Sequence, residues 1–187
     1  MKLIIQAILL TIVFTVLTGL LYPLAVTGIA QVAFHDKANG SLIERDGKVV
    51  GSELLAQQFT GPTYFWPRPS AGSYATVPSG ASNLGPTSGA LQSNVLSNAK
   101  AFRDGNKLAA DVPVPADMVF TSGSGLDPHI SPEAARLQIA RVATERTTDV
   151  AQVTALVEKF VESPQWGFLG EPRVNVLLLN LALDQHK

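Results

Sequence analysis

One segment of the chain, SGSGLDPHISPEAARLQIARVATER over residues 122–146, combines glycines, an acid, a histidine and a helix start, as a ligand site can. Within it, Asp127 and His129 form an Asp-x-His pair that offers two metal ligands. A zinc site takes three or four ligands, and the chain has no cysteine and only three histidines. We therefore expect Asp127 and His129 to be turn residues that hydrogen-bond the backbone of their own loop.

Motifs for phosphate binding or covalent catalysis are missing from the sequence. It contains neither a GxxxxGK[ST] loop nor a GxSxG elbow. His35, His129 and His186 are scattered, so a serine hydrolase would have to recruit His129 from a distance. We expect no catalytic constellation. Arg136 and Arg141 are expected to be solvated or to tether a loop, with phosphate binding as the second interpretation.

Two helices are expected to position this segment. Ser131 can cap a helix over residues 132–146, and Pro132 suits the first helical position because that amide needs no partner. A second helix is expected from Asp149, which has the spacing of a capping box with Gln152. Its buried stripe comprises apolar residues at helical spacing: Val153, Leu156, Val157 and Phe160.

The sequence before this segment predicts a hairpin, a short helix and a long loop. Asp46-Gly47 is a pair typical of tight hairpin turns. Residues 52–60 have helical spacing, with Ser52 as a candidate N-cap. Residues 61–89 are rich in glycine, proline and serine, which cannot sustain a regular ladder. This loop is expected to pack on a core or to dock against a partner, because it carries four aromatic residues: Tyr64, Phe65, Trp66 and Tyr74.

The rest of the chain predicts further helices and short strands. An amphipathic helix is expected after residue 87, ending before Gly105, with three inward residues: Leu91, Val95 and Phe102. Residues 117–122 favour a short strand. Residues 174–184 fit a helix by composition and a strand by alternation, and both alternatives stay open. These elements indicate an α+β fold: one small mixed domain after an N-terminal helix.

Composition and charge limit the classes of partner. The chain is 46% hydrophobic and has a formal net charge of −1. Without a basic field it cannot hold a nucleic-acid backbone, so nucleic acid is not an expected partner. The absence of cysteine excludes disulfides but leaves the redox compartment undetermined.

The N-terminal residues 1–34 are expected to form a transmembrane anchor in contact with lipid. No charged residue occurs between Lys2 and His35, and this apolar run is longer than the roughly 20 residues that cross a bilayer. The alternative is a signal peptide cleaved after Ala30, although signal cores are usually shorter. A small-residue face at Thr15, Thr18 and Gly19 indicates a partner helix.

The orientation of this anchor is not decided by charge alone. Lys2 lies on one side, and Lys37, Arg45 and Lys48 lie on the other. Because large C-terminal domains translocate largely regardless of charge, we expect a cytoplasmic N-terminus and an extracytoplasmic domain over residues 35–187.

Several long motifs, in order along nearly the whole chain, resemble the KdpC family, the C subunit of the bacterial potassium-transporting P-type ATPase (Kdp) complex. The resemblance rests on these stretches: TGLLYPL, ANGSLI, GSELLAQQF, YFWPRPSA, SGASNLGPTS, SGSGLDPHISPEAA, RVATER and VNVLLLNLALD.

The resemblance implies an inner-membrane, single-pass, non-catalytic subunit of an ATP-driven potassium uptake complex, needed for its assembly and stability. Its implied partners are a channel-like potassium-binding subunit, an ATP-hydrolysing subunit and a small accessory peptide. The family is also described as a catalytic chaperone that raises the ATP affinity of the hydrolysing subunit. No cofactor of its own is expected, and ATP would enter only through the complex. The alternative is a membrane-anchored extracytoplasmic enzyme or binding module unrelated to potassium transport.

Gln152 is the position that matches a glutamine proposed in the family to contact nucleotide. The family's stretch is LSGGQ-like, whereas TTDVAQ lacks the Leu-Ser opening, and Gln152 also suits a helix cap. A domain outside the membrane cannot touch cytosolic ATP. We therefore expect an outer domain that covers the ion-entry side of the channel-like subunit.

Overall fold

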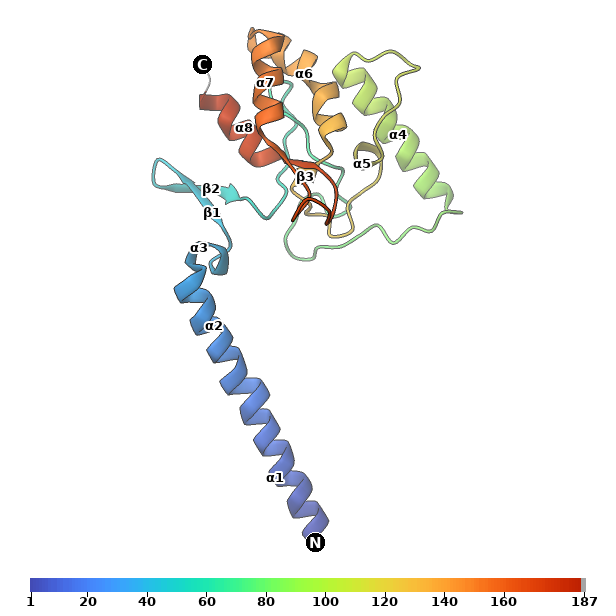
Figure 1. The fold of residues 1–187 in the computed structure, drawn as a ribbon. Helices are drawn as coiled ribbons and strands as arrows, with labels where there is room; N and C mark the ends of the chain where they lie inside the picture. Colours follow the sequence, from blue (N-terminus) through green and yellow to red (C-terminus); the bar gives the residue numbers. More distant parts are fainter. Residues whose placement is uncertain (186–187) are drawn as a thin grey trace. The chain divides into compact units, whose positions relative to one another are not determined.

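A computed structural model describes residues 1–185 of the chain. It divides into two compact units, one of residues 1–50 and one that begins at Gly51 (Figure 1). The first unit contains a long helix and most of a hairpin. A short helix over residues 35–38 also belongs to the first unit, and the second contains the later helices and a small three-stranded sheet. This confirms the expected fold class, an N-terminal apolar helix followed by a mixed helix and strand domain.

The N-terminal helix is continuous from Lys2 to Ala33 and is built from α1 (Lys2–Val16), a π-helical segment η1 (Leu17–Leu21) and α2 (Tyr22–Ala33). Its 32 residues correspond to about 48 Å at 1.5 Å per residue, more than the roughly 30 Å of a hydrocarbon core. Among the described residues it is the one helix that is long and apolar enough to cross a membrane. It also runs through Ala30 without a break.

Pro23 explains the π-helical segment. Proline has no amide hydrogen, and its ring crowds the carbonyl four residues earlier, at Gly19. Widening the helix over Leu17–Leu21 accommodates both effects. The Thr18 hydroxyl donates to the Phe14 carbonyl at 2.7 Å, so this polar side chain is satisfied inside the apolar helix.

The predicted hairpin is confirmed. After the short helix α3 (His35–Ala38), strands β1 (Leu42–Arg45) and β2 (Lys48–Ser52) pair with each other. Asp46 and Gly47 between them both have positive φ, 52° and 72°. Two central residues with positive φ give the turn that matches the twist of a two-residue hairpin.

The second unit combines helices with one small sheet, and most of these elements are labelled in Figure 1. Its elements are α4 (Gly89–Asn106), α5 (Ala116–Val119), β3 (His129–Ile130), α6 (Pro132–Arg146), α7 (Val150–Lys159), β4 (Val161–Glu162), β5 (Arg173–Asn175) and α8 (Val176–Gln185). The sheet order is β3-β5-β4 and both pairings are antiparallel. Helix α6 packs against α7 and α4, and α8 packs against α7.

The starts of α6 and α7 follow from their caps, as predicted. The Ser131 hydroxyl accepts the Ala134 amide at 3.1 Å, and the Asp149 carboxylate accepts the Ala151 amide at 3.0 Å. Both satisfy donors that a helix start leaves free. The apolar faces then meet in a core whose fully buried members include Phe65, Ile130, Val142, Val153, Val157, Val174 and Leu179.

Three expected elements differ from the structure. The predicted helix over 52–60 is wrong: the Ser52 hydroxyl caps only a turn at Leu54, and the Ala56 amide bonds the Leu126 carbonyl at 2.9 Å. Leu54 and Leu55 are exposed, so no buried stripe supports a helix there. The predicted strand over 117–122 is also wrong, because α5 occupies its first half.

The third difference is the end of α4. The helix passes Gly105 and ends at Asn106, where Lys107 takes the left-handed conformation that closes a helix. The Asn106 side chain also donates to the Phe102 carbonyl at 2.8 Å. At the C-terminus, both alternatives for 174–184 are partly right, since β5 is followed directly by α8.

Candidate functional site

The aromatic segment of the long loop, residues 62–66, is bound by side chains rather than by a neighbouring strand. Asn180 of α8 accepts the Phe65 amide at 2.8 Å and donates to the Phe65 carbonyl at 3.0 Å. Gln138 of α6 pairs with Trp66 in the same way, at 2.8 and 3.3 Å. Each side-chain amide thus provides the donor and the acceptor that the backbone of a neighbouring strand would otherwise provide.

Arg141 of α6 joins this segment to α4. Its guanidinium donates to the carbonyls of Pro62 and Tyr64, and also to the side-chain oxygens of Asn106 and Gln138. It stacks on the Trp66 ring at 3.9 Å, a cation–π contact. Burial lowers the pKa of Arg141 to about 10, while Glu145 raises it, so the side chain stays protonated at neutral pH.

Arg146, five residues further along α6, completes the attachment. It donates to the Thr63 carbonyl at 2.7 Å, pairs with Asp184 at 2.8 Å, and lies 4.9 Å from the Tyr64 ring centroid. The five successive carbonyls from residue 62 to residue 66 therefore all accept hydrogen bonds from side chains of α6 or α8. We call residues 62–66 the clamped segment.

The glycine-rich part of the segment over residues 122–146 supports the loop. Gly125 has φ +73°, and a Cβ there would lie 3.0 Å from the Gly80 carbonyl oxygen. Only glycine allows this close approach between two loop segments without strain. Gly105 plays the same role in α4, because a methyl group there would overlap the Trp66 ring.

Asp127 and His129 form part of this scaffold. Asp127 accepts the His129 amide at 3.0 Å and pairs with Arg68 at 2.7 Å, so it links two loops as a turn residue. Burial opposes its ionisation, but hydrogen bonds from His129 and the Arg68 guanidinium outweigh burial and hold the pKa of Asp127 at about 2. Among residues 1–185, no three His, Cys, Asp or Glu side chains gather as metal ligands would.

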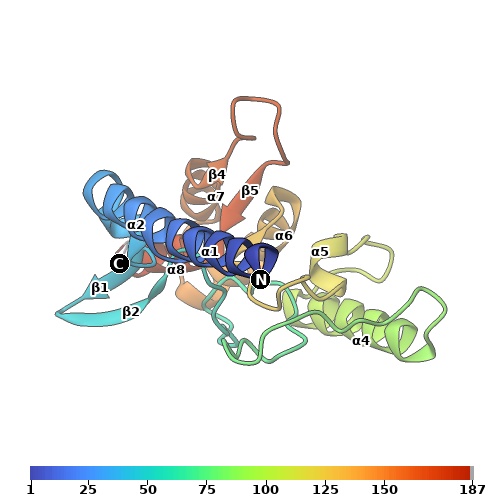
Figure 2. The ribbon, with the colours of Figure 1, turned by 90° about the horizontal axis from the view of Figure 1, so that it is seen from below.

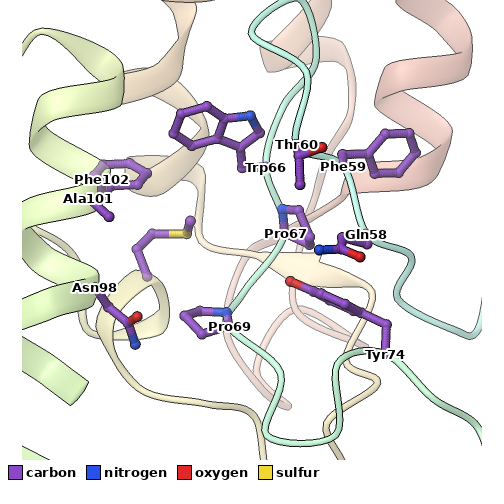
Figure 3. A pocket seen from close by; sticks show the side chains of 11 residues that line it. Gln58, Phe59, Thr60, Trp66, Pro67, Pro69, Tyr74, Asn98, Ala101 and Phe102 are labelled. Carbon is purple, nitrogen blue, oxygen red and sulfur yellow. The ribbon is translucent and has the colours of Figure 1, made fainter.

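Beside the clamped segment the domain carries an open, largely apolar pocket of about 550 Å³. Figure 3 shows side chains of α4 on one side and of the loop on the other, around a common space. Its lining residues are Gln58, Phe59, Thr60, Trp66, Pro67, Pro69, Tyr74, Asn98, Ala101, Phe102 and Met118. The Tyr74 hydroxyl donates to the Arg68 carbonyl at 2.8 Å, and burial raises the pKa of this tyrosine. With no charged side chain in its wall, the pocket suits apolar contact.

The other sequence-predicted residues lie elsewhere. Arg136 forms an exposed two-point ion pair with Glu158 of α7, so it is the solvated charge that was expected. Gln152 is exposed in the first turn of α7, and within residues 1–185 its side chain does not return a hydrogen bond to Asp149. The predicted capping box is therefore formed only on the Asp149 side. His186 lies outside the described residues.

Gln138, Asn180 and Asn106 carry much of the attachment, although they are not among the residues predicted from the sequence. The sequence does hold a signal for them, because each is a polar side chain on the inward face of its helix. A buried polar group needs partners, and the buried amides in LQIA and LNLA could have been assigned to some unpaired backbone. The sequence does not indicate which backbone groups they pair with, because the clamped segment lies more than 70 residues away from Gln138.

These features are those of a small protein with one candidate membrane-spanning helix and a domain that carries an open apolar surface. Residues 4–185 match the family model described as "KdpC: K+-transporting ATPase, c chain". The chain belongs to this family and is a subunit of a potassium-transport complex.

Individual relatives agree with the family match. The chain is 56% identical over 181 residues to the potassium-transporting ATPase KdpC subunit of Rhodospirillum rubrum, covering 96% of this chain and 93% of that protein. It is 52% identical over 181 residues to the protein of the same name from Methylococcus capsulatus, covering 95% of each. A third, from Dechloromonas aromatica, is 53% identical over 184 residues.

Proposed function

We propose that the chain is a non-catalytic subunit that assembles and stabilises an ATP-driven potassium uptake complex. The observation that carries this proposal is the family match over residues 4–185, which includes both the apolar helix and the domain. The partners are a channel-like potassium-binding subunit, an ATP-hydrolysing subunit and a small accessory peptide. The domain contacts them through its own surface, and the helix contacts lipid and neighbouring helices.

The proposed location is the bacterial inner membrane, crossed once by the anchor over residues 1–34, with a cytoplasmic N-terminus. The domain over residues 35–187 then lies on the extracytoplasmic side, above the ion entrance of the channel-like subunit. The pocket beside the clamped segment supports a docking role for the loop, because an open apolar hollow beside a firmly held aromatic segment suits the apolar centre of an interface.

We also propose that the subunit raises the ATP affinity of the hydrolysing subunit from a distance. A domain outside the membrane cannot reach nucleotide, so this effect passes through the membrane partners. Gln152 supports the competing model of direct nucleotide contact, because its exposed amide is free to bind a partner group within the described part of the chain. The two models differ in the side on which the domain lies.

The experiment is a tagged full chain co-expressed with the other subunits in cells that lack the native copy. We expect the tagged chain to co-purify with them and to restore growth at limiting potassium. The chain purified alone should hydrolyse neither ATP nor esters. Hydrolysis that persists after removal of contaminating ATPases and is lost in His129→Ala would instead support the extracytoplasmic enzyme.

A further inference from the structure

A second apolar feature of the domain is the tip that connects β4 to β5, residues 163–170, which we call the docking hairpin. Figure 2 shows this connection extending beyond the helices around it. Trp166 is 85% exposed, Phe168 is 73% exposed and Leu169 is 45% exposed. Two aromatic side chains and a leucine are thus presented together to solvent, which is uncommon unless a surface is used for contact.

The docking hairpin is a defined structure and not a loose loop. The Gln165 and Leu169 backbones exchange two hydrogen bonds of 2.9 Å each, and the Gly167 amide donates to the Pro164 carbonyl at 3.0 Å. At its base, Arg173 of β5 pairs with Glu162 of β4 at 2.9 Å. The apolar side chains are therefore held in position before any partner arrives, which lowers the entropy cost of binding.

Trp166 occupies its place at a conformational cost. Its φ is +54°, in the left-handed region that favours glycine or asparagine. The indole contributes little burial energy to the domain that would offset this cost, because most of its surface faces solvent. Backbone strain of this kind clusters at binding and active sites, and tryptophan is enriched among the residues that dominate the binding energy of protein interfaces.

Charge distinguishes between the possible occupants. The tip itself, residues 163–170, contains no charged residue. Its borders carry Glu162 and Arg173, which neutralise each other, and Glu171, which is exposed and makes no ion pair within residues 1–185. A surface of anionic lipid would favour free basic residues here. An apolar centre beside an acidic side chain instead matches a protein pocket with a cationic rim.

We propose that the docking hairpin inserts Trp166 and Phe168 into an apolar pocket on another subunit of the potassium ATPase, and that a cationic side chain on the rim of that pocket faces Glu171. This inference rests on the proposed function, because it requires the chain to assemble with partner subunits. It adds the contact element and the chemistry of its receptor.

The first test places a benzophenone amino acid at Phe168 of the full chain, co-expressed with the other subunits. Irradiation of the membranes should produce a crosslink to a subunit of the same ATPase, identified by mass spectrometry. Crosslinks to lipid alone would overturn the proposal in favour of a membrane contact. The absence of any crosslink, while the chain still co-purifies with its partners, would also overturn it.

The second test measures recovery of the complex with a tagged chain. Trp166→Ser combined with Phe168→Ser should lower recovery about ten-fold or more, as loss of central interface residues does. Glu171→Lys should lower it several-fold, because it faces like charge. Val150→Ser changes a residue that is 51% exposed at the start of α7, outside the docking hairpin and the long loop, and this control should leave recovery unchanged. Equal recovery of all variants would contradict the docking role.

Folding and assembly are separated from docking by two controls. The hairpin variants should unfold at the same temperature as the unchanged chain, because the replaced side chains face solvent. Trp166→Tyr, which keeps an aromatic ring, should retain most of the recovery. If the unchanged chain does not co-purify with the other subunits, the proposed function is rejected. If the unchanged chain and the serine variants co-purify equally well, only the docking role of the hairpin is rejected.

Discussion

Arg141 shows how a single residue holds the clamped segment. Four acceptors share its guanidinium, so Arg141→Ala leaves buried oxygens without a donor. We expect a loss of about 3 to 5 kcal/mol in the free energy of unfolding, since each unpaired buried group costs about 1 to 3 kcal/mol. Thermal unfolding of the full chain in detergent measures this.

The control for this prediction is Arg136→Ala. Its partner Glu158 is exposed, and exposed ion pairs contribute little to stability because solvent screens them. Arg141→Lys should recover only part of the loss, because a lysine cannot reproduce the planar fork or its stacking on Trp66. Similar unfolding temperatures for Arg136→Ala and Arg141→Ala would contradict this account.

Gly105 provides a second prediction at the residue scale. A Cβ at this position would lie 2.6 Å from the Cζ3 atom of Trp66, and the indole cannot give way while it stacks on Arg141. Gly105→Ala should therefore destabilise the domain by about 1 to 3 kcal/mol, although alanine is the better helix former. Gly89→Ala, where nothing lies within 4 Å, should be neutral or stabilising in the same unfolding assay.

Asp127 gives the domain a defined dependence on pH. Its pKa is about 2 in the folded state against an ordinary value of 3.8, so the folded state binds fewer protons than the unfolded state between these values. Its contribution is complete above about pH 5 and is lost as the pH falls toward 2. Asp127→Asn should remove this part of the acid destabilisation in melting curves recorded from pH 6 to pH 2.5. A variant curve that parallels the original would assign the effect to other carboxylates.

At the scale of elements, the sequence predicted the helices and strands whose causes lie in neighbouring residues. It did not predict those that depend on residues far away along the chain. The caps Ser131 and Asp149 lie next to the helices they begin, so both helices could be predicted from neighbouring residues. The helix expected over 52–60 had the right spacing, but the Ala56 amide bonds Leu126 instead, and this tertiary bond has no local signal. The strand expected over 117–122 failed for a similar reason, since Asp117 is turned to accept the Ser131 amide.

The candidate site likewise has some features that the sequence predicts and others that depend on long-range packing. Its aromatic residues and the tethering role of Arg141 could be predicted from residue type. The pairing of Asn180 with Phe65 spans 115 residues and depends on how α8 packs, so no local pattern contains it. The pocket arises only when α4 meets the loop, for the same reason.

The N-terminal helix carries a prediction of its own. A Cβ at Gly19 has nothing within 4 Å, so Gly19→Leu costs the isolated helix nothing. If a partner helix packs on the face of Thr15, Thr18 and Gly19, the leucine blocks close approach and recovery of the complex falls. Gly28→Leu is the matched control, because it is equally open and lies about two and a half helical turns after Gly19, on a different side of the helix. Equal recovery of the two variants would place the partner on another face.

At the scale of the whole molecule, the chain combines one apolar helix with a domain. In this domain, buried polar side chains hold a long loop in place by hydrogen bonds. The glycine-rich segment, Asp127, and Arg141 and Arg146 of α6 all stabilise an aromatic loop. The domain's two apolar features, the pocket and the docking hairpin, face solvent in the isolated chain. This arrangement is what the proposed assembly role requires.

The most direct test of this role combines ATP affinity with the side on which the domain lies. The chain has no native cysteine, so Ser93→Cys on the exposed face of α4 reports accessibility to an impermeant maleimide without background. We predict labelling from outside the inner membrane in spheroplasts, an increased KM for ATP when the chain is omitted, and an unchanged KM in Gln152→Glu. Labelling only after lysis, together with an increased KM in Gln152→Glu, would contradict the outer accessory subunit and establish direct contact with nucleotide.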